Sequence, residues 1–161
     1  MSTDEFVEAD DDCVSDDRWS NVQMSCDAAS SFLGRKGWGC LTLANEGCAY
    51  SVPMSFGYDG EETVYFHLQT DERSEKMAYL DATERATLLV PEVEPPDWTS
   101  VVVRGPIESV PDEEVDDAYA ACAENAWFPA CPWPDDRDPT ELRFYKLAAD
   151  EVTGRTSVVS G

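Results

Sequence analysis

The chain has 161 residues, 42% of them hydrophobic and 11% aromatic, which is enough to build one folded domain. Its 34 acidic residues outnumber 11 basic ones, and the formal net charge of −23 would repel nucleic acid and anionic membranes, so neither is an expected partner. No apolar run reaches the roughly 18 residues of a membrane helix, and the acidic N-terminus is unlike a signal peptide. We therefore expect a cytoplasmic protein.

The acidic residues are spread along the whole sequence, and the three lysines are outnumbered by eight arginines. This composition resembles that of proteins from halophilic archaea that accumulate salt, because high salt screens the repulsion between surface charges. We interpret the charge as a surface adaptation. The alternative is an acidic surface that binds a partner or buffers metal ions. It is disfavoured, because such a surface would concentrate the acidic residues in one segment.

The six cysteines are an even number, which formally permits disulfides. No two of them have CxxC spacing and none neighbours the single histidine, so a zinc site is not expected. In a cytoplasmic chain we expect them to be free and mostly buried. A nucleophilic cysteine with His67 as its base remains an open alternative. The cysteines are Cys13, Cys26, Cys40, Cys48, Cys122 and Cys131.

In chain order, residues 1–19 are predicted to form a flexible acidic tail. Ser25 is a suitable N-cap for a helix over residues 26–33, which Gly34 would end. Strands are predicted over residues 38–44 and 48–56. The second contains Pro53, which has no N–H to donate, so we expect a sheet edge, a bulge or a place where a ligand replaces the neighbouring strand.

Asp59 and Gly60 lie between two β-rich runs, which is the strongest short signal for a hairpin. The returning strand is predicted over residues 63–69. A helix over residues 71–80 follows, with Thr70 or Asp71 as its cap.

Two further strands are predicted over residues 86–93 and 98–110, joined by a proline-containing loop. Pro111 suits the first position of an amphipathic helix that runs to about residue 126. A proline-rich loop over residues 128–139 leads to a last strand over residues 142–152. Residues 155–161 are predicted to be a C-terminal tail.

This order of elements predicts a mainly β (α+β) domain over residues 20–154. Six antiparallel strands with Greek-key connections close their edges most economically as a barrel with flanking helices. The motifs of common enzyme classes are absent from the sequence, including phosphate-binding loops, nucleophile elbows and HExxH. If the protein is an enzyme, we therefore expect a bound cofactor to supply the chemistry.

Five segments in this order and spacing resemble the pyridoxamine 5'-phosphate oxidase-like flavoproteins, closest to the branch that contains the nitroimidazole-resistance flavoproteins. The resemblance covers about residues 26–154. It implies a six-stranded split barrel, a bound FMN and a homodimer with the flavin at its interface, using an electron donor such as NAD(P)H. The segments are GWGCLTLA, YSVPMSFGYDG, VYFHL, RSEKMAYL and WTSVVVRG.

The resemblance also implies which residues bind the cofactor. One strand would lie along the flavin ring, the end of the next would lie at its rim, a serine–lysine pair would clamp the phosphate, and the penultimate strand would add a contact. Glu75 stands where the family has a basic residue. In this order the implied residues are Tyr50, Ser51, Val52, Pro53, Met54, Ser55, His67, Leu68, Ser74, Lys76, Trp98 and Ser100.

Physical chemistry agrees with the implied phosphate site. Ser74 and Lys76 at a helix start would supply N–H donors and a positive charge to a phosphate. The alternatives are a lysine paired with an acid on the helix surface and, for His67, a purely structural histidine.

The chain lacks the C-terminal tryptophan and arginine motifs with which true pyridoxamine phosphate oxidases bind their substrate. We therefore expect an FMN-dependent oxidoreductase of another substrate. The alternatives are a flavin-binding or flavin-storage protein without catalysis, a split barrel that binds haem or a deazaflavin, and a structural dimer without a cofactor. No metal site is expected.

Overall fold

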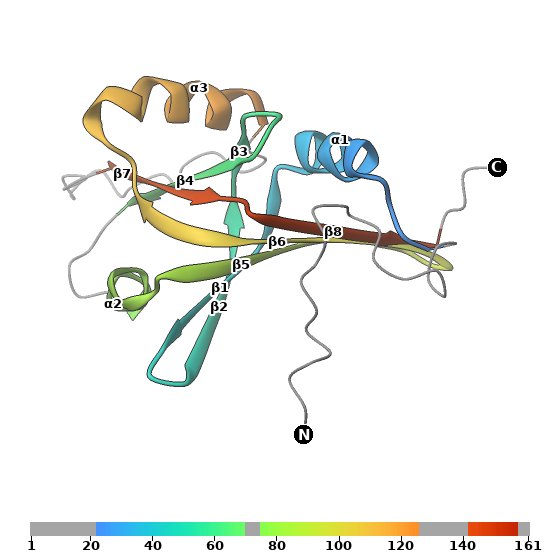
Figure 1. The fold of residues 1–161 in the computed structure, drawn as a ribbon, viewed down its shortest axis with the longest axis horizontal. Coiled ribbons are helices and arrows are strands. Elements are labelled where there is room, and N and C mark those ends of the chain that lie inside the picture. Colours follow the sequence, from blue (N-terminus) through green and yellow to red (C-terminus); the bar gives the residue numbers. More distant parts are fainter. Residues whose placement is uncertain (1–21, 70–74, 126–141, 158–161) are drawn as a thin grey trace, which may run out of the picture.

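The computed structural model describes residues 22–69, 75–125 and 142–157, and Figure 1 shows a strongly curved sheet with helices packed around it. Within these ranges no helix is long and apolar enough to cross a membrane. The elements are α1 (Cys26–Lys36), β1 (Trp38–Asn45), β2 (Cys48–Ser55), β3 (Gly57–Tyr58), β4 (Thr63–Gln69), α2 (Glu75–Ala82), β5 (Arg85–Glu94), β6 (Asp97–Ser109), the 3-10 turn η3 (Asp112–Glu114), α3 (Val115–Asn125), β7 (Leu142–Ala148) and β8 (Glu151–Thr156).

The strands are ordered β2-β1-β5-β6-β7-β4-β3, with β8 added beside β6, and every pairing is antiparallel. This arrangement confirms the predicted antiparallel split barrel. The predicted number of six strands is wrong, because the described residues alone form eight. Two divisions of the chain account for the difference: β3 begins just past the predicted strand over residues 48–56, and the predicted strand over residues 142–152 is split into β7 and β8.

The first division occurs at Phe56, between β2 and β3. The Phe56 N–H donates to the carbonyl of Gly37 at 2.9 Å, and its side chain is fully buried. Gly37 lies directly before β1 and in register with Phe56, so this bond is the last of the β1–β2 ladder. The predicted strand over residues 48–56 ends at Ser55, and a short new strand begins at Gly57.

The second division occurs at Ala149 and Asp150, between β7 and β8. The Ala149 N–H donates to the carbonyl of Glu62 at 2.7 Å, and the Asp150 N–H donates to the carbonyl of Arg104 at 3.0 Å. The chain thereby crosses from β4 to β6, and β8 continues to Thr156, two residues past the predicted end of the domain.

Helix α1 begins as predicted, because the Ser25 hydroxyl accepts the N–H of Ala28 at 3.1 Å. The prediction that Gly34 ends the helix is wrong. The helix continues to Lys36 and ends at Gly37, whose φ of 73° is the left-handed conformation that favours glycine at a helix end.

The turn at Asp59 and Gly60 forms as predicted. One carboxylate oxygen of Asp59 accepts the N–H groups of Glu61, Glu62 and Thr63 at 2.8–3.0 Å. The hairpin joins β4 to the short β3, and β4 has the predicted bounds. The long strand β2 instead pairs with β1.

The other helices differ from prediction at their ends. Helix α2 ends at Ala82 rather than at residue 80, and the cap expected at residue 70 or 71 lies outside the described residues. Pro111 precedes the turn η3 as its N-cap rather than starting a helix, and α3 then runs from Val115. The acidic tail and the predicted loop over residues 128–139 also lie outside the described residues.

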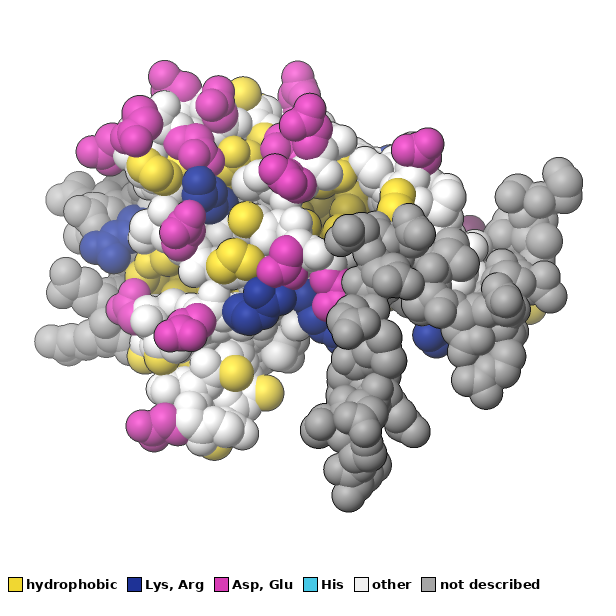
Figure 2. Space-filling view, in the orientation of Figure 1, with side chains coloured by type: hydrophobic (Ala, Val, Ile, Leu, Met, Phe, Trp, Pro, Cys, Tyr) yellow, Lys and Arg dark blue, Asp and Glu magenta, His cyan; other side chains and the backbone are white. Residues whose placement is uncertain are grey.

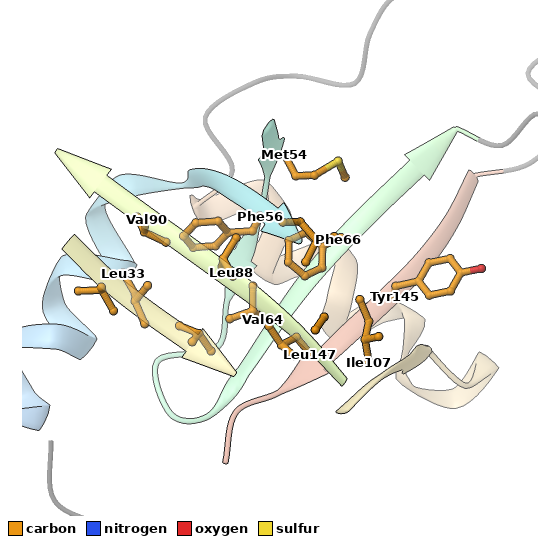
Figure 3. Close-up of a cluster of buried hydrophobic side chains, with 14 of the residues drawn as sticks. Leu33, Met54, Phe56, Val64, Phe66, Leu88, Val90, Ile107, Tyr145 and Leu147 are labelled. Atoms are coloured by element: carbon orange, nitrogen blue, oxygen red, sulfur yellow. The ribbon is translucent and has the colours of Figure 1, made fainter. Parts of the chain in front are cut away.

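The main core lies inside the curved sheet and is covered by α1 and α2. Figure 3 shows side chains from several strands and α1 converging there, with Phe56 and Phe66 at its centre. A second, smaller cluster lies between α3 and the opposite face of β4 and β7. It consists of Tyr65, Val110, Ala118, Ala121, Cys122 and Phe144.

The cysteines follow the prediction only in part. Cys122 is free and buried, Cys40 is free and half-buried, and Cys48 is free but exposed. Cys26 is disulfide-bonded, so the prediction that all six are free is wrong for this residue.

Candidate functional site

The six implied residues of β2 alternate between two faces. Tyr50, Val52 and Met54 pack toward the core, whereas Ser51 and Pro53 are exposed on the outer face. Among the described residues β2 pairs only with β1, so its second edge carries no strand. Pro53 therefore lies in an edge strand, which is one of the positions expected for it. A ligand could hydrogen-bond to the backbone along that edge.

Helix α2 is held against the hairpin of β1 and β2. The rings of Tyr79 and Tyr50 stack with centroids 5.2 Å apart and planes inclined by 21°. At the helix end, the Ala44 N–H donates to the hydroxyl of Thr83 at 3.1 Å. These contacts fix the position of α2, and thus of Lys76 in its first turn, relative to β2.

Lys76 is a half-buried cation with no ion pair to any described residue. Burial lowers the pKa of its ammonium group, because desolvation disfavours the charged form. The other two lysines are neutralised: Lys36 lies 3.4 Å from Glu92, and Lys146 donates to Glu114 at 2.9 Å. In a chain with a net charge of −23, a partly buried lysine without an acidic partner is a candidate anion site.

Ser74, the second implied residue of the phosphate clamp, lies outside the described residues. The structure therefore describes only the lysine of this pair.

His67 and Leu68 lie on opposite faces of β4. Leu68 is 3% exposed and packs in the main core, so only its backbone could contact a ligand. His67 packs edge-on against Phe144, with ring centroids 6.2 Å apart, and burial lowers the pKa of its imidazole. Within the described part of the chain the imidazole has no hydrogen-bond partner, which leaves it able to bind a ligand as a neutral group.

A cysteine nucleophile activated by His67 finds no geometric support among the described residues. The buried Cys122 thiol donates to the carbonyl of Tyr65 at 3.7 Å, and burial raises its pKa to about 11. Such a thiol is protonated at neutral pH and is a poor nucleophile. The described residues also contain no group of three side chains suited to bind a metal ion.

Trp98 and Ser100 lie on the outer face of β6. Ser100 pairs with Pro91 of β5, and the register places it three strands across the sheet from Ser55 of β2. With strands about 4.8 Å apart, this separation is about 14 Å. A single protomer therefore presents the implied residues of β2 and α2 apart from those of β6, and His67 and Leu68 lie on a third element, β4.

No helix within the described ranges packs on the outer face between the β2 and β6 groups, because α1 and α2 contribute to the core on the opposite face. Leu89, Val93 and Trp98 are 38%, 67% and 39% exposed there. Elsewhere, Figure 2 shows acidic side chains scattered over the visible surface with few basic ones among them. We call the apolar surface that Leu89, Val93 and Trp98 form on β5 and β6 the bare face.

The structure adds candidate residues that sequence reasoning missed. Gln23, Arg104 and Arg155 line a pocket together with Ser100. Alternation along β6 could have placed Ser100 and Arg104 on one face. The neighbour Arg155 could not have been found, because the sequence gives no separate signal for β8.

Comparisons with known proteins agree with this fold. The family model described as pyridoxamine 5'-phosphate oxidase matches residues 25–156, so the chain belongs to this family. A search of curated proteins found no match.

Solved structures of low sequence identity share the fold. A FAD-binding protein from Mesorhizobium loti is 23% identical with a TM-score of 0.65, covering 84% of this chain and 97% of that protein. A FAD-binding protein from Mycobacterium smegmatis is 18% identical with a TM-score of 0.64, covering 86% and 99%. A proposed 5-nitroimidazole antibiotic resistance protein from Bacteroides thetaiotaomicron is 19% identical with a TM-score of 0.62, covering 84% and 86%.

Proposed function

We propose that this protein is a homodimeric, FMN-binding flavoprotein that acts as an oxidoreductase on a substrate other than pyridoxamine 5'-phosphate. The observation that carries the proposal is Lys76, a half-buried cation without an acidic partner among the described residues. A phosphate dianion beside it would offset the cost of burying this charge.

The chain's own residues fit a flavin mononucleotide. The open edge of β2 would present backbone groups to the ring, and Lys76 would hold the single phosphate. His67 is neutral near pH 7, because burial lowers the pKa of its imidazole. When bound, the flavin would supply the electron or hydride transfer. The FAD-binding proteins that share this fold support a flavin ligand.

The bare face supports the homodimer. An exposed apolar patch on a sheet usually marks an interface, and Leu89, Val93 and Trp98 form such a patch. The two groups of implied residues are about 14 Å apart in one protomer, at three strand spacings. Packing the bare faces of two copies together would bring Ser100 of one copy toward β2 of the other and complete each site.

The test is to purify the protein and titrate it with FMN while recording the flavin absorbance near 450 nm. Wild-type protein should bind FMN, and Lys76→Gln should weaken the binding by about ten-fold or more, the expected effect of losing a charge-assisted contact. Arg85→Gln is the matched control, because it removes the same charge from an exposed side chain outside the site.

Two outcomes would contradict parts of this proposal. Failure to take up FMN, with a Soret band after addition of haem, would replace the flavin with haem. FMN binding without reduction by NAD(P)H and without turnover of quinones or nitro compounds would leave a flavin-binding protein that is not an oxidoreductase.

A further inference from the structure

A pocket of about 360 Å³ lies on the outer face of the sheet, where β6 runs beside β8. This volume is at the lower end of the range for small-molecule sites. Lys76, the proposed phosphate ligand of the flavin, is not among its lining residues. These are Gln23, Ser100, Val102, Arg104, Thr153, Gly154 and Arg155.

Strand register explains why polar side chains meet in this pocket. Ser100 and Arg104 share the outer face of β6, because side chains two residues apart on a strand point the same way. Arg155 of β8 is the direct neighbour of Ser100, and Thr153 is the neighbour of Val102. Two guanidinium groups and two hydroxyls, all hydrogen-bond donors, are thereby brought to one place.

Positive charge is unusual in this chain, which has only 11 basic residues against 34 acidic ones. Two of the 11 line the pocket. Glu151 lies beside it and accepts a hydrogen bond from Arg104 at 3.4 Å, a long contact between partly exposed groups. An exposed pair of this kind is weak, so a better acceptor could replace Glu151.

Gln23 adds a second, independent observation. Its side-chain oxygen Oε1 is buried and has no hydrogen-bond partner among the described residues. The backbone here is fixed, because Gln23 pairs with Arg155 and the Met24 N–H donates to the carbonyl of Gly154 at 2.9 Å. A buried polar atom without a partner is costly, and a ligand with an N–H or O–H group could satisfy it once the Gln23 amide rotates.

We propose that this pocket binds the carboxylate or phosphate group of a small molecule that also carries a hydrogen-bond donor. Arg104 and Arg155 bind the oxyanion, Ser100 and Thr153 donate to it, and Gln23 accepts from the donor group. Arginine suits this role because its planar guanidinium can form two parallel hydrogen bonds to an oxyanion. Ser100 also belongs to the group that the proposed dimer would bring toward the flavin. Arg104, Arg155 and Thr153, in contrast, are not among the residues implied for the flavin. The pocket is therefore tested in flavin-free protein.

The test titrates lactate, which has a carboxylate and a hydroxyl, and inorganic phosphate into flavin-free protein at fixed ionic strength, with calorimetric detection. Arg155→Gln should weaken binding of the preferred probe by about ten-fold or more. Glu151→Gln should strengthen it, because it removes the acceptor that competes for Arg104. Tighter binding of lactate supports a carboxylate ligand, and tighter binding of phosphate supports a phosphate ligand.

The matched controls come from a neighbouring ion pair. Arg85 and Asp150 form an exposed pair at 2.7 Å on the same sheet but do not line the pocket. Arg85→Gln and Asp150→Asn make the same charge changes, and both should leave probe binding unchanged.

Three results would overturn the inference. They are the absence of binding by the wild-type protein, an equal loss in Arg155→Gln and Arg85→Gln, and no gain in Glu151→Gln. The last variant keeps the test valid if Arg155→Gln fails to fold. FMN uptake measured on the same variants separates this site from the proposed flavin site, since Lys76→Gln should affect only FMN.

Discussion

The curved sheet has apolar side chains on its outer face in two regions, of which one is covered by a helix and the other is exposed. On β4 and β7, Tyr65 and Phe144 are covered by α3 and are 6% and 8% exposed. On β5 and β6, Leu89 and Val93 are 38% and 67% exposed. Figure 1 shows α3 lying along the first region.

This difference in exposure distinguishes the apolar side chains that stabilise the protomer from those that are available for an interface. Burial removes apolar area from water, and each buried side chain contributes in proportion to that area. The α3 side is therefore part of the fold of one chain. The bare face gains the same kind of stabilisation only if a second surface covers it.

The largest expected effect is on the covered side. Phe144→Ala should lower the free energy of unfolding by about 3–5 kcal/mol, because it leaves a cavity under α3. Val93→Ala on the bare face should change it by less than about 0.5 kcal/mol at protein concentrations where the chain is monomeric. Urea unfolding measures both, and equal losses would erase the distinction between the two regions.

The next effect concerns Gly57 in β3, over which α3 packs. A Cβ at this position would collide with the backbone of Ala121 and Cys122. Gly57→Ala should therefore destabilise the fold by about 1–3 kcal/mol, the usual cost of overpacking. In Gly34→Ala the added carbon meets nothing within 4 Å, and the helix should become more stable by up to about 1 kcal/mol. Thermal unfolding of both variants provides the comparison.

A charge on the bare face should separate the protomers. Leu89→Glu is expected to weaken self-association by about ten-fold or more, because a carboxylate without a partner is costly to bury. Tyr119→Glu on α3 is the control, since Tyr119 is 64% exposed and outside the bare face. Light scattering across a dilution series measures the association. A dimer that persists unchanged in Leu89→Glu would exclude this face as its interface.

The smallest effect tests His67 at the edge of the covered region. Burial lowers the pKa of His67 in the native state below its ordinary value of 6.5. At a pH between the native and the unfolded pKa, the unfolded state therefore binds a proton that the native state does not. Stability should therefore fall as the pH falls through 6.5. Because His67 is the only histidine, His67→Gln should lose less stability over this range, as measured by urea unfolding at several pH values.

Much of the local structure could be predicted because its signals lie within a few residues. Ser25 caps α1, and Asp59 and Gly60 place the turn before β4. The end of α1 was missed because Gly34 and Gly37 are both plausible stops, and contacts such as the donation from the Asn125 amide to the Gly34 carbonyl at 2.7 Å exist only in the folded chain. The break at Ala149 depends on hydrogen bonds to the distant carbonyls of Glu62 and Arg104, which no local pattern reveals.

The candidate site shows the same limit. Lys76 could be singled out by its rarity, but its lack of an ion pair with the described residues is a property of the folded chain. The proximity of Ser100 and Arg155 arises from pairing between β6 and β8, across 55 residues of sequence. Pattern reasoning finds side chains that share a strand face, and it cannot supply neighbours that come from another part of the chain.

Strand β6 belongs to both halves of the sheet. Its first part lies between β5 and β8, and its last part, Ile107–Ser109, pairs with β7. Because β6 is hydrogen-bonded to β5, β7 and β8, we expect its middle to open only when the sheet around it opens. The amides of Val101 and Val103, fully buried in the middle of β6, are then expected to be among the last to exchange with deuterium.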